Sequence, residues 1–359
     1  MTTNKQKISI AVAGLRGIPN VMGGVETHCE ELYKRLSAHF TVIVYARKGY
    51  SESSEISDSL KVKALYSPKR QAFETPIHTL LAILHCFIFA KVTVFHIHGI
   101  GGSIFLPLAK LLFPKVIVTH HSQNYEHQKW GKLARWVFKC GEYFALNYAD
   151  NVLFVSKTLL KQSQARFPKK AKNFSFIANG FSLPAESSEL TEFVKTPFFL
   201  AVGRLVPEKG FHDLIDVFNL YQGTEKLIIA GDTDFKSKYA DSIKARANSN
   251  VLFIGKKNRS ELKWLYSHCH SFIMPSYSEG LPISALEAVS CSAPVLLSDI
   301  VQNKDLGFPD ECYFKLGDID NILQMLNRGG AHVNKRILEN YDWDSIAESY
   351  EILIKEGVV

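Results

Sequence analysis

Cysteine pairs, long uninterrupted apolar segments and common nucleotide-binding fingerprints are absent from this 359-residue chain. Its six cysteines are scattered, and none forms a CxxC pair or another metal-ligand spacing. Such cysteines are typical of small buried side chains in a reducing compartment. The chain also lacks the glycine fingerprint of dinucleotide-binding domains and the GK[ST] ending of a P-loop, which argues against a Rossmann dehydrogenase and a P-loop nucleotidase.

A membrane span and a signal peptide are not indicated either. The only tempting stretch, residues 77–97, is interrupted by three histidines and Lys91, and a buried helix followed by a buried strand explains it better. The polar N-terminus leads directly into the apolar run 8–13, which predicts a first strand. We therefore expect a cytoplasmic protein.

Charge is distributed unevenly between the two halves of the chain. Residues 1–180 contain 24 Lys and Arg against 10 Asp and Glu, whereas the whole chain has a net charge of +7. A basic first half predicts contact with something anionic: a membrane surface, a lipid pyrophosphate or a nucleic acid. No RNP, zinc or helix-turn-helix pattern is present, so we expect no nucleic-acid partner.

Short β-branched runs alternate with helical periods, a pattern typical of parallel sheets with crossover helices. The polar stretch 182–196 interrupts this rhythm, and we interpret it as a linker. The predicted domains are residues 1–181 and 197–337. A C-terminal helix within 338–359 is a candidate to pack back toward the first domain. The fold class is α/β, with two doubly wound Rossmann-like domains facing a central cleft.

In the first domain, strand 8–13 is followed by the loop Gly14-Leu15-Arg16-Gly17-Ile18-Pro19-Asn20-Val21-Met22-Gly23-Gly24 and an amphipathic helix. Paired glycines before a helix let backbone N–H groups approach a ligand, and a helix N-terminus favours an anion. A plain tight turn explains the glycines equally well.

The predicted second domain repeats this arrangement with the loop Gly203-Arg204-Leu205-Val206-Pro207-Glu208-Lys209-Gly210, directly after its first strand, 198–202. Arg204 offers a planar fork to phosphate oxygens and Lys209 a mobile point charge. A solvated basic loop is the alternative.

The segment Ser278-Glu279-Gly280-Leu281-Pro282-Ile283-Ser284-Ala285-Leu286-Glu287 joins strand 271–274 to a helix expected to begin near Pro282. Glu287 lies among small apolar residues, where a carboxylate needs a partner, and ribose hydroxyls would serve. A capping glutamate plus an unrelated ion-paired one is the alternative.

Glu279 and Glu287, with seven residues between them, resemble the E-x7-E signature of retaining GT-B glycosyltransferases, especially family 4. The loops around Gly23 and Arg204, and the segment THHSQNYEHQKW before ADNVLFVS, resemble that family in the same order. The resemblance covers nearly the whole chain, and it implies that the first predicted domain lies on the acceptor side and that the second binds the nucleotide sugar. It points to the bacterial subgroup that assembles cell-surface polysaccharides.

This resemblance implies a role for each site residue. Gly23 and Gly24 would approach the donor phosphates, and Arg204 and Lys209 would hold the leaving diphosphate in place of a metal. Glu287 would bind the ribose.

Five further residues would surround the donor sugar. Glu279 would lie beside it, with the backbone of Gly280, Leu281 and Pro282 near sugar and phosphate. His121 matches a family histidine near the sugar, although the adjacent His120 fits the same position.

The resemblance therefore implies a metal-independent, retaining transferase that needs no cofactor, since the nucleotide-sugar donor is a substrate. The acceptor would be a glycan or a polyprenyl-diphosphate-linked sugar, with possible peripheral attachment to an anionic inner membrane surface. The segment 122–125, SQNY, departs from the subgroup's usual pattern and puts the chemistry near His121 in doubt. Asp232-Thr233-Asp234 spells a D-x-D motif in the wrong context, so we expect no metal site.

Two other functions remain compatible with this fold. A nucleotide-sugar 2-epimerase shares the architecture but needs no acceptor. A non-catalytic sugar-nucleotide-binding protein is the other alternative. The sequence does not identify the donor base, the sugar, the linkage or the oligomeric state.

Overall fold

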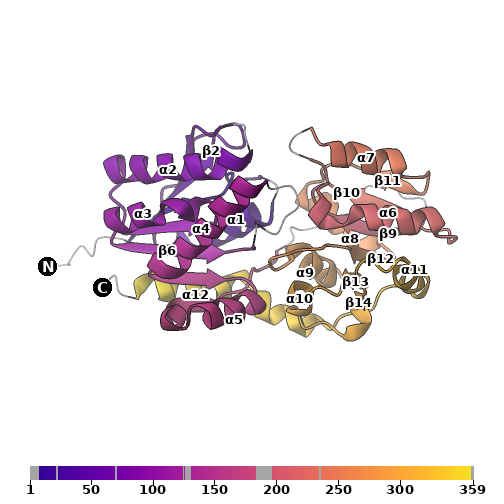
Figure 1. Cartoon of the computed structure of the whole chain (residues 1–359). Helices are drawn as coiled ribbons and strands as arrows, with labels where there is room; N and C mark the ends of the chain where they lie inside the picture. The colour runs from indigo at the N-terminus through magenta and orange to yellow at the C-terminus, as the bar shows by residue number, and fades with distance from the viewer. Residues whose placement is uncertain are drawn as a thin grey trace. The chain divides into compact units, whose positions relative to one another are not determined.

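The computed structural model describes residues 8–21, 23–68, 71–123, 125, 131–182, 196–233 and 236–356. The chain forms two compact units, the first made of residues 1–180 and 342–359 and the second of residues 181–341 (Figure 1). The expected linker falls almost wholly on residues 183–195, which lie outside the described residues.

The first unit contains an eight-stranded sheet with the order β3-β4-β2-β1-β5-β6-β7-β8. The strands are β1 (Ser9–Ala13), β2 (Thr41–Arg47), β3 (Ser54–Ser57), β4 (Leu60–Leu65), β5 (Val94–His98), β6 (Lys115–His120), β7 (Asn151–Phe154) and β8 (Phe174–Phe176). The helices are α1 (Gly24–Leu36), α2 (Gln71–Phe89), α3 (Leu106–Leu112), α4 (Lys132–Tyr148), α5 (Lys157–Arg166) and α12 (Trp343–Lys355). All neighbouring strands are parallel except β3, which is antiparallel to β4.

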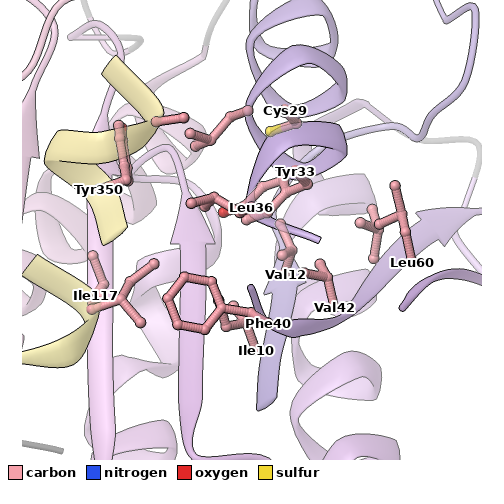
Figure 2. Close-up of a cluster of buried hydrophobic side chains, with 14 of the residues drawn as sticks. Ile10, Val12, Cys29, Tyr33, Leu36, Phe40, Val42, Leu60, Ile117 and Tyr350 are labelled. Atoms are coloured by element: carbon pink, nitrogen blue, oxygen red, sulfur yellow. The ribbon is translucent and has the colours of Figure 1, made fainter. Parts of the chain in front are cut away.

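Both faces of this sheet are covered by helices. Successive side chains of a strand point to opposite faces, and in β1 Ile10 and Val12 pack with α1 and α12 while Ala11 and Ala13 pack with α2 to α5. Figure 2 shows the first of these cores, where Tyr33 of α1 and Tyr350 of α12 lie over the strands. The continuous apolar runs noted in the sequence follow from this two-sided burial.

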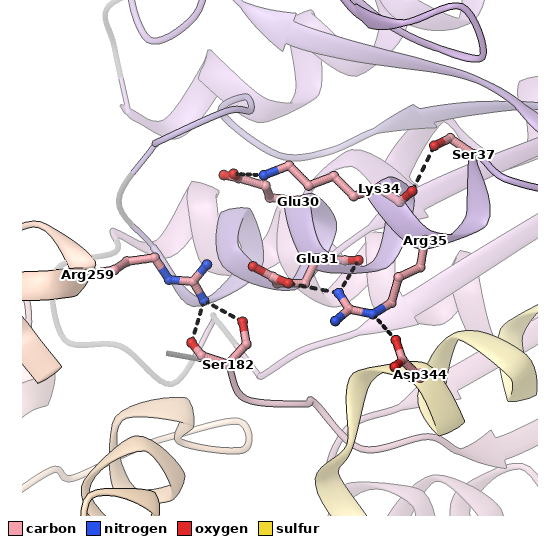
Figure 3. A network of polar contacts seen from close by, with 8 residues as sticks. All are labelled: Glu30, Glu31, Lys34, Arg35, Ser37, Ser182, Arg259 and Asp344. Atoms are coloured by element: carbon pink, nitrogen blue, oxygen red, sulfur yellow. Dashed lines mark hydrogen bonds and ion pairs between the residues drawn. The ribbon is translucent and has the colours of Figure 1, made fainter. Parts of the chain in front are cut away.

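The C-terminal helix α12 belongs to the first unit and packs against α1. Arg35 of α1 forms an ion pair of 2.5 Å with Asp344 (Figure 3). Lys115 of β6 donates to the carbonyl oxygens of Leu353 and Glu356 at 2.6 and 2.5 Å and so satisfies the last turn of the helix. The helix begins at Trp343, because Asp342 caps it through the backbone N–H of Ser345.

The second unit contains a parallel sheet with the order β11-β10-β9-β12-β13-β14. The strands are β9 (Phe198–Val202), β10 (Lys226–Ala230), β11 (Val251–Phe253), β12 (Ser271–Met274), β13 (Val295–Ser298) and β14 (Tyr313–Phe314). The helices are α6 (Phe211–Leu220), α7 (Lys238–Arg246), α8 (Arg259–His268), α9 (Ile283–Ser290), α10 (Val301–Lys304) and α11 (Ile319–Arg328). Two doubly wound Rossmann-like units are therefore present, as predicted.

Each sheet has one point where the strand order reverses. In the first unit β1 lies between β2 and β5, and in the second β9 lies between β10 and β12. Ligands of open α/β sheets bind at the carboxyl ends of the strands beside such a reversal. The loops after β1, β5, β9 and β12 are consequently the places to look for a site. No helix among the described residues is long and apolar enough to cross a membrane.

Candidate active site

Two glutamates of α1 hold the glycine loop of the first unit. Glu26 Oε1 accepts a hydrogen bond from the backbone N–H of Arg16 at 3.1 Å, and Glu30 Oε2 accepts from Asn20 N–H at 2.9 Å. Both carboxylates are largely buried. Sequence reasoning missed this function, although their spacing of four residues at the start of α1 places them on one side of the helix.

Gly23 and Gly24 have different surroundings at the start of α1. Gly23 adopts a φ of 151°, which side chains with a Cβ rarely adopt, so the backbone favours glycine here; the atom nearest to such a Cβ would be Glu26 Oε2, at 1.9 Å. A Cβ on Gly24 would meet no atom within 4 Å. The space beside Gly24 is thus open to a ligand, and the predicted approach of phosphate to both glycines stays a prediction.

The adjacent histidines at the end of β6 have separate partners. His120 Nε2 lies 3.1 Å from Glu142 Oε1, and Glu142 also accepts from Arg166 at 2.8 Å. His121 Nε2 lies 3.0 Å from His98 Nδ1, which follows from the pairing of β5 with β6. His120 therefore contacts the buried carboxylate of Glu142, while His121 contacts the last residue of β5.

In the second unit the loop after β9 packs closely against the loop after β12. Gly210 adopts a left-handed φ of 67°, and a Cβ on it would lie 1.9 Å from the carbonyl oxygen of Pro275. The backbone N–H of Tyr277 donates to the Glu208 carbonyl at 2.9 Å. Because β9 and β12 are parallel neighbours, their carboxyl ends place these two loops side by side.

This contact brings Lys209 and Glu279 together. Lys209 Nζ lies 2.5 Å from Glu279 Oε1, and the Ser276 hydroxyl donates to the same oxygen at 2.6 Å. The two side chains are 22% and 11% exposed, so the pair is shielded from solvent yet reachable. The guanidinium of Arg204 makes no hydrogen bond or ion pair with another side chain in the described part of the chain.

Glu287 is buried in α9 with an exposure of 8%. The Tyr266 hydroxyl donates to its Oε2 at 3.1 Å. Burial raises the pKa of the Glu287 carboxyl to about 7, although the charge of Arg259 and the Tyr266 hydrogen bond act in the opposite direction. A carboxyl that ionises near neutrality gains from additional hydroxyl donors, such as those of a ribose.

The helix after Glu279 begins one residue later than expected. Pro282 is the N-cap of α9 and Ile283 its first residue, so proline does not occupy the first helical position. Leu281 is buried with an exposure of 5%. The predicted contacts of Gly280, Leu281 and Pro282 with sugar and phosphate remain predictions.

Among the described residues, one group of side chains is close enough together to bind a metal ion. Nitrogen atoms of His28, His98 and His121, all buried, lie within 4.8 Å of one another. His28 lies in α1, His98 in β5 and His121 directly after β6. The three histidines are far apart in the sequence, so their spacing did not indicate a metal site. The D-x-D motif lies partly outside the described residues, because Asp234 does; its Asp232 is 3.6 Å from Lys244.

Two protein-family models match the chain. The model "Glycosyltransferase Family 4" matches residues 22–183, and "Glycosyl transferases group 1" matches residues 184–306. The O-antigen chain mannosyltransferase RfbU of Salmonella typhimurium is 30% identical over 152 residues, which are 42% of each chain. The match therefore spans less than half of that relative's length.

Solved structures show the same fold. The sucrose-phosphate synthase of Thermosynechococcus elongatus has a TM-score of 0.81 at 19% identity, covering 97% of this chain and 98% of that one. Anabaena HepE in complex with UDP-glucose has a TM-score of 0.74 at 15% identity, covering 96% and 99%. The chain has two Rossmann-like units, glycosyltransferase family models match both of them, and its structural neighbours are GT-B proteins. The chain therefore belongs to glycosyltransferase family 4 and has the GT-B fold.

Proposed function

We propose that this glycosyltransferase transfers a sugar with retention of configuration from a nucleotide-diphosphate sugar to a glycan or lipid-linked acceptor, without a metal, in bacterial surface polysaccharide assembly. The observation that carries the proposal is the Lys209–Glu279 pair at the strand-order reversal of the second unit, with buried Glu287 in the following helix. HepE was solved with UDP-glucose and RfbU is named for O-antigen assembly, which supports the substrate class.

Each polar group then has a defined task. The Glu287 carboxylate accepts the ribose hydroxyls, and Arg204 and Lys209 bind the diphosphate and stabilise its charge as the C1–oxygen bond breaks. An ammonium has three N–H donors, so Lys209 can remain bound to Glu279 while it binds a phosphate oxygen. Glu279 lies beside the sugar. In the front-side mechanism that we favour, a donor phosphate oxygen accepts the proton of the attacking hydroxyl.

A panel of nucleotide sugars tests the proposal. One donor should raise the melting temperature of the full chain, because a ligand that binds the folded state stabilises it in proportion to its occupancy. With that donor, free nucleotide should form only when an acceptor is present, and NMR should show the donor's anomeric configuration in the product. Conversion of the nucleotide sugar into its 2-epimer without acceptor would favour a 2-epimerase, and binding without any turnover would favour a non-catalytic protein.

We also propose that the first unit attaches to the anionic inner face of the membrane. Three large apolar side chains, Leu111 of α3 and Leu133 and Trp136 of α4, are 81%, 64% and 60% exposed. Helix α3 packs against α4, which also carries the exposed basic residues Lys132 and Arg135. Apolar side chains beside basic ones are typical of surfaces that bind anionic lipid.

Sedimentation with phosphatidylglycerol vesicles checks this surface. We expect the double variant Leu133→Ser/Trp136→Ser to sediment several-fold less than the unchanged protein, and added salt to weaken sedimentation of both. Leu220→Ser is the control, because Leu220 of α6 is similarly exposed at 55% but lies in the second unit. Equal sedimentation with neutral and anionic vesicles would refute the proposal.

A further inference from the structure

Three buried histidines of the first unit come close together although they are far apart in the sequence. One ring nitrogen each of His28, His98 and His121 lies within 4.8 Å of the other two. His98 Nδ1 is 3.0 Å from His121 Nε2, since β5 and β6 are neighbouring strands. We call these three residues the histidine group. No carboxylate or cysteine belongs to it.

A tyrosine hydroxyl holds one ring of the group in place. The hydroxyl oxygen of Tyr33 lies 2.7 Å from His98 Nε2, and Tyr33 itself is fully buried in α1 (Figure 2). With its Nε2 at this oxygen, His98 presents Nδ1 to the rest of the group. A histidine that binds a metal through one ring nitrogen almost always hydrogen-bonds through the other, which fixes the orientation of its ring. His98 has this arrangement.

The other two histidines lose little by binding an ion. His28 is 0% exposed, yet its Nδ1 makes no hydrogen bond to any residue that the structure describes, and its Nε2 has only a long contact of 3.4 Å with the Tyr350 hydroxyl. Either ring nitrogen of His28 can therefore give its lone pair to an ion without breaking a short hydrogen bond. His121 makes no hydrogen bond in the described part of the chain other than that with His98. A buried ring with so few partners costs stability unless a ligand satisfies it.

Metal binding needs a lone pair from each ring, so the hydrogen atoms of the group must lie on the opposite nitrogens. A neutral histidine has one N–H, and moving that hydrogen to the other ring nitrogen frees the lone pair without a net loss of protons. In His98 the hydrogen then points to the Tyr33 oxygen, which can accept it. The hydrogen bond between His98 and His121 is the arrangement of the group without metal, and an ion replaces it.

The ligand atoms select the kind of ion. Three imidazole nitrogens suit Zn²⁺ and the other late first-row metals, whereas Mg²⁺ and Ca²⁺ prefer oxygen. On a tetrahedral zinc ion with Zn–N bonds of about 2.0–2.1 Å, two ligand nitrogens lie about 3.4 Å apart. The nitrogens of His98 and His121 are 3.0 Å apart, and no pair in the group exceeds 4.8 Å. Ring rotations that move a nitrogen by about 1.5 Å or less complete the site.

We propose that His28, His98 and His121 bind one Zn²⁺ ion, which links α1 to the ends of β5 and β6, with Tyr33 orienting the His98 ring. Water takes the fourth position on the side of His121, the most exposed of the three rings. The ion has a structural role within the first unit. The proposed function does not depend on it, because the diphosphate-binding residues Arg204 and Lys209 belong to the second unit.

Metal binding by the full chain tests this site. After removal of metal with a chelator, we expect titration with Zn²⁺ to show one ion bound per chain, and titration with Mg²⁺ to show no binding. Excess Zn²⁺ should raise the melting temperature by several degrees, because the ion binds the folded arrangement of the three rings. Co²⁺ in place of Zn²⁺ should give the intense visible absorption of a four-coordinate ion. The near-ultraviolet band of a cobalt–thiolate bond should be absent, which separates this site from binding at the six cysteines.

Substitutions of the ligands should weaken zinc binding most. Tyr33→Phe should lower the zinc affinity by about 10- to 100-fold, as is typical when a ligand loses the partner of its other nitrogen. His121→Gln and His28→Gln each remove a ligand, so each should lower it by more than about 100-fold. His120→Gln is the matched control, because His120 is adjacent and also buried but contacts Glu142 at 3.1 Å. It should bind zinc like the unchanged protein.

Circular dichroism of the metal-free variants checks their folding. If His28→Gln does not fold, His121→Gln carries the test, because His121 follows a strand and is not part of a helix. Absence of zinc binding, equal zinc affinity of His121→Gln and the unchanged protein, or a cobalt–thiolate band would overturn the proposal. Loss of sugar transfer in a chain that still binds one zinc would contradict the proposed function alone.

Discussion

Replacing Lys209 by alanine is expected to reduce the turnover of sugar transfer by about 10²- to 10³-fold, which is typical for loss of one preorganised donor to a developing negative charge. The departing diphosphate gains charge as the bond to the sugar breaks, and Lys209 already lies at the strand ends where we place it. Arg204→Ala should have an effect of similar size. The KM for the donor should rise less than kcat falls, because the charge is greatest in the transition state.

Folding should survive both substitutions. Lys209 is partly exposed, and Glu279 keeps its hydrogen bond from the Ser276 hydroxyl when the ammonium is removed. The melting temperature of Lys209→Ala should therefore stay within a few degrees of the unchanged protein. Arg246→Ala is the matched control, because it removes a cation paired with Asp216 between α7 and α6 of the same unit. Near-normal transfer by Lys209→Ala would refute the assignment, as would an equal loss in the control.

Donor binding is expected to weaken by about tenfold for each pH unit below 7, because the ribose hydroxyls require the ionised form of one carboxyl group, Glu287. Its pKa of about 7 in the folded chain places this change near neutrality. Calorimetric titration with an intact nucleotide sugar measures this pH dependence directly. Each phosphate of the donor carries two substituents and therefore stays ionised over this range. Glu287→Gln should bind weakly and without this pH dependence.

The stability of the free protein should change in the opposite sense. The folded pKa of Glu287 exceeds the ordinary value of 4.5, so the folded chain binds more protons than the unfolded one between pH 4.5 and 7. Its contribution to stability is full below pH 4.5 and falls by about 3 kcal/mol as the pH rises through 7. Glu287→Gln should remove this fall in urea unfolding.

Tyr266→Phe removes the hydroxyl that donates to Glu287, so the midpoint of donor binding should move to higher pH in this variant. Affinity for the donor that is identical at pH 5.5 and pH 8 in the unchanged protein would show that Glu287 does not bind the ribose.

Much of the fold was predictable because strands that are buried on both faces of a sheet are continuous apolar runs in the sequence. The runs around Ile10 and Phe199 were recognised as strands for this reason, and both residues are fully buried. Two strands were missed: β3 is largely exposed on the sheet edge, and β14 has two residues. Neither carries an apolar run long enough to be distinguished from a loop.

The amino-acid sequence alone predicted the two Rossmann-like units and the loops that follow their first strands, and it indicated Arg204, Lys209, Glu279 and Glu287 as candidate site residues. It could do so because strand burial, helix periodicity and loop position are local properties. Which loops meet depends on strand order, and neighbouring strands β9 and β12 are separated by two further strands in the sequence.

Only the tertiary structure therefore decided that Lys209 pairs with Glu279, seventy residues away. It also decided that His96 and His98 of β5 share the hydroxyl of Tyr33 in α1, and that His98 contacts His121, which follows β6. Such contacts are stronger inside the protein, where water is excluded, than in solvent. Which side chains become buried together depends on how distant elements pack, and the spacing of residues along the chain does not reveal it.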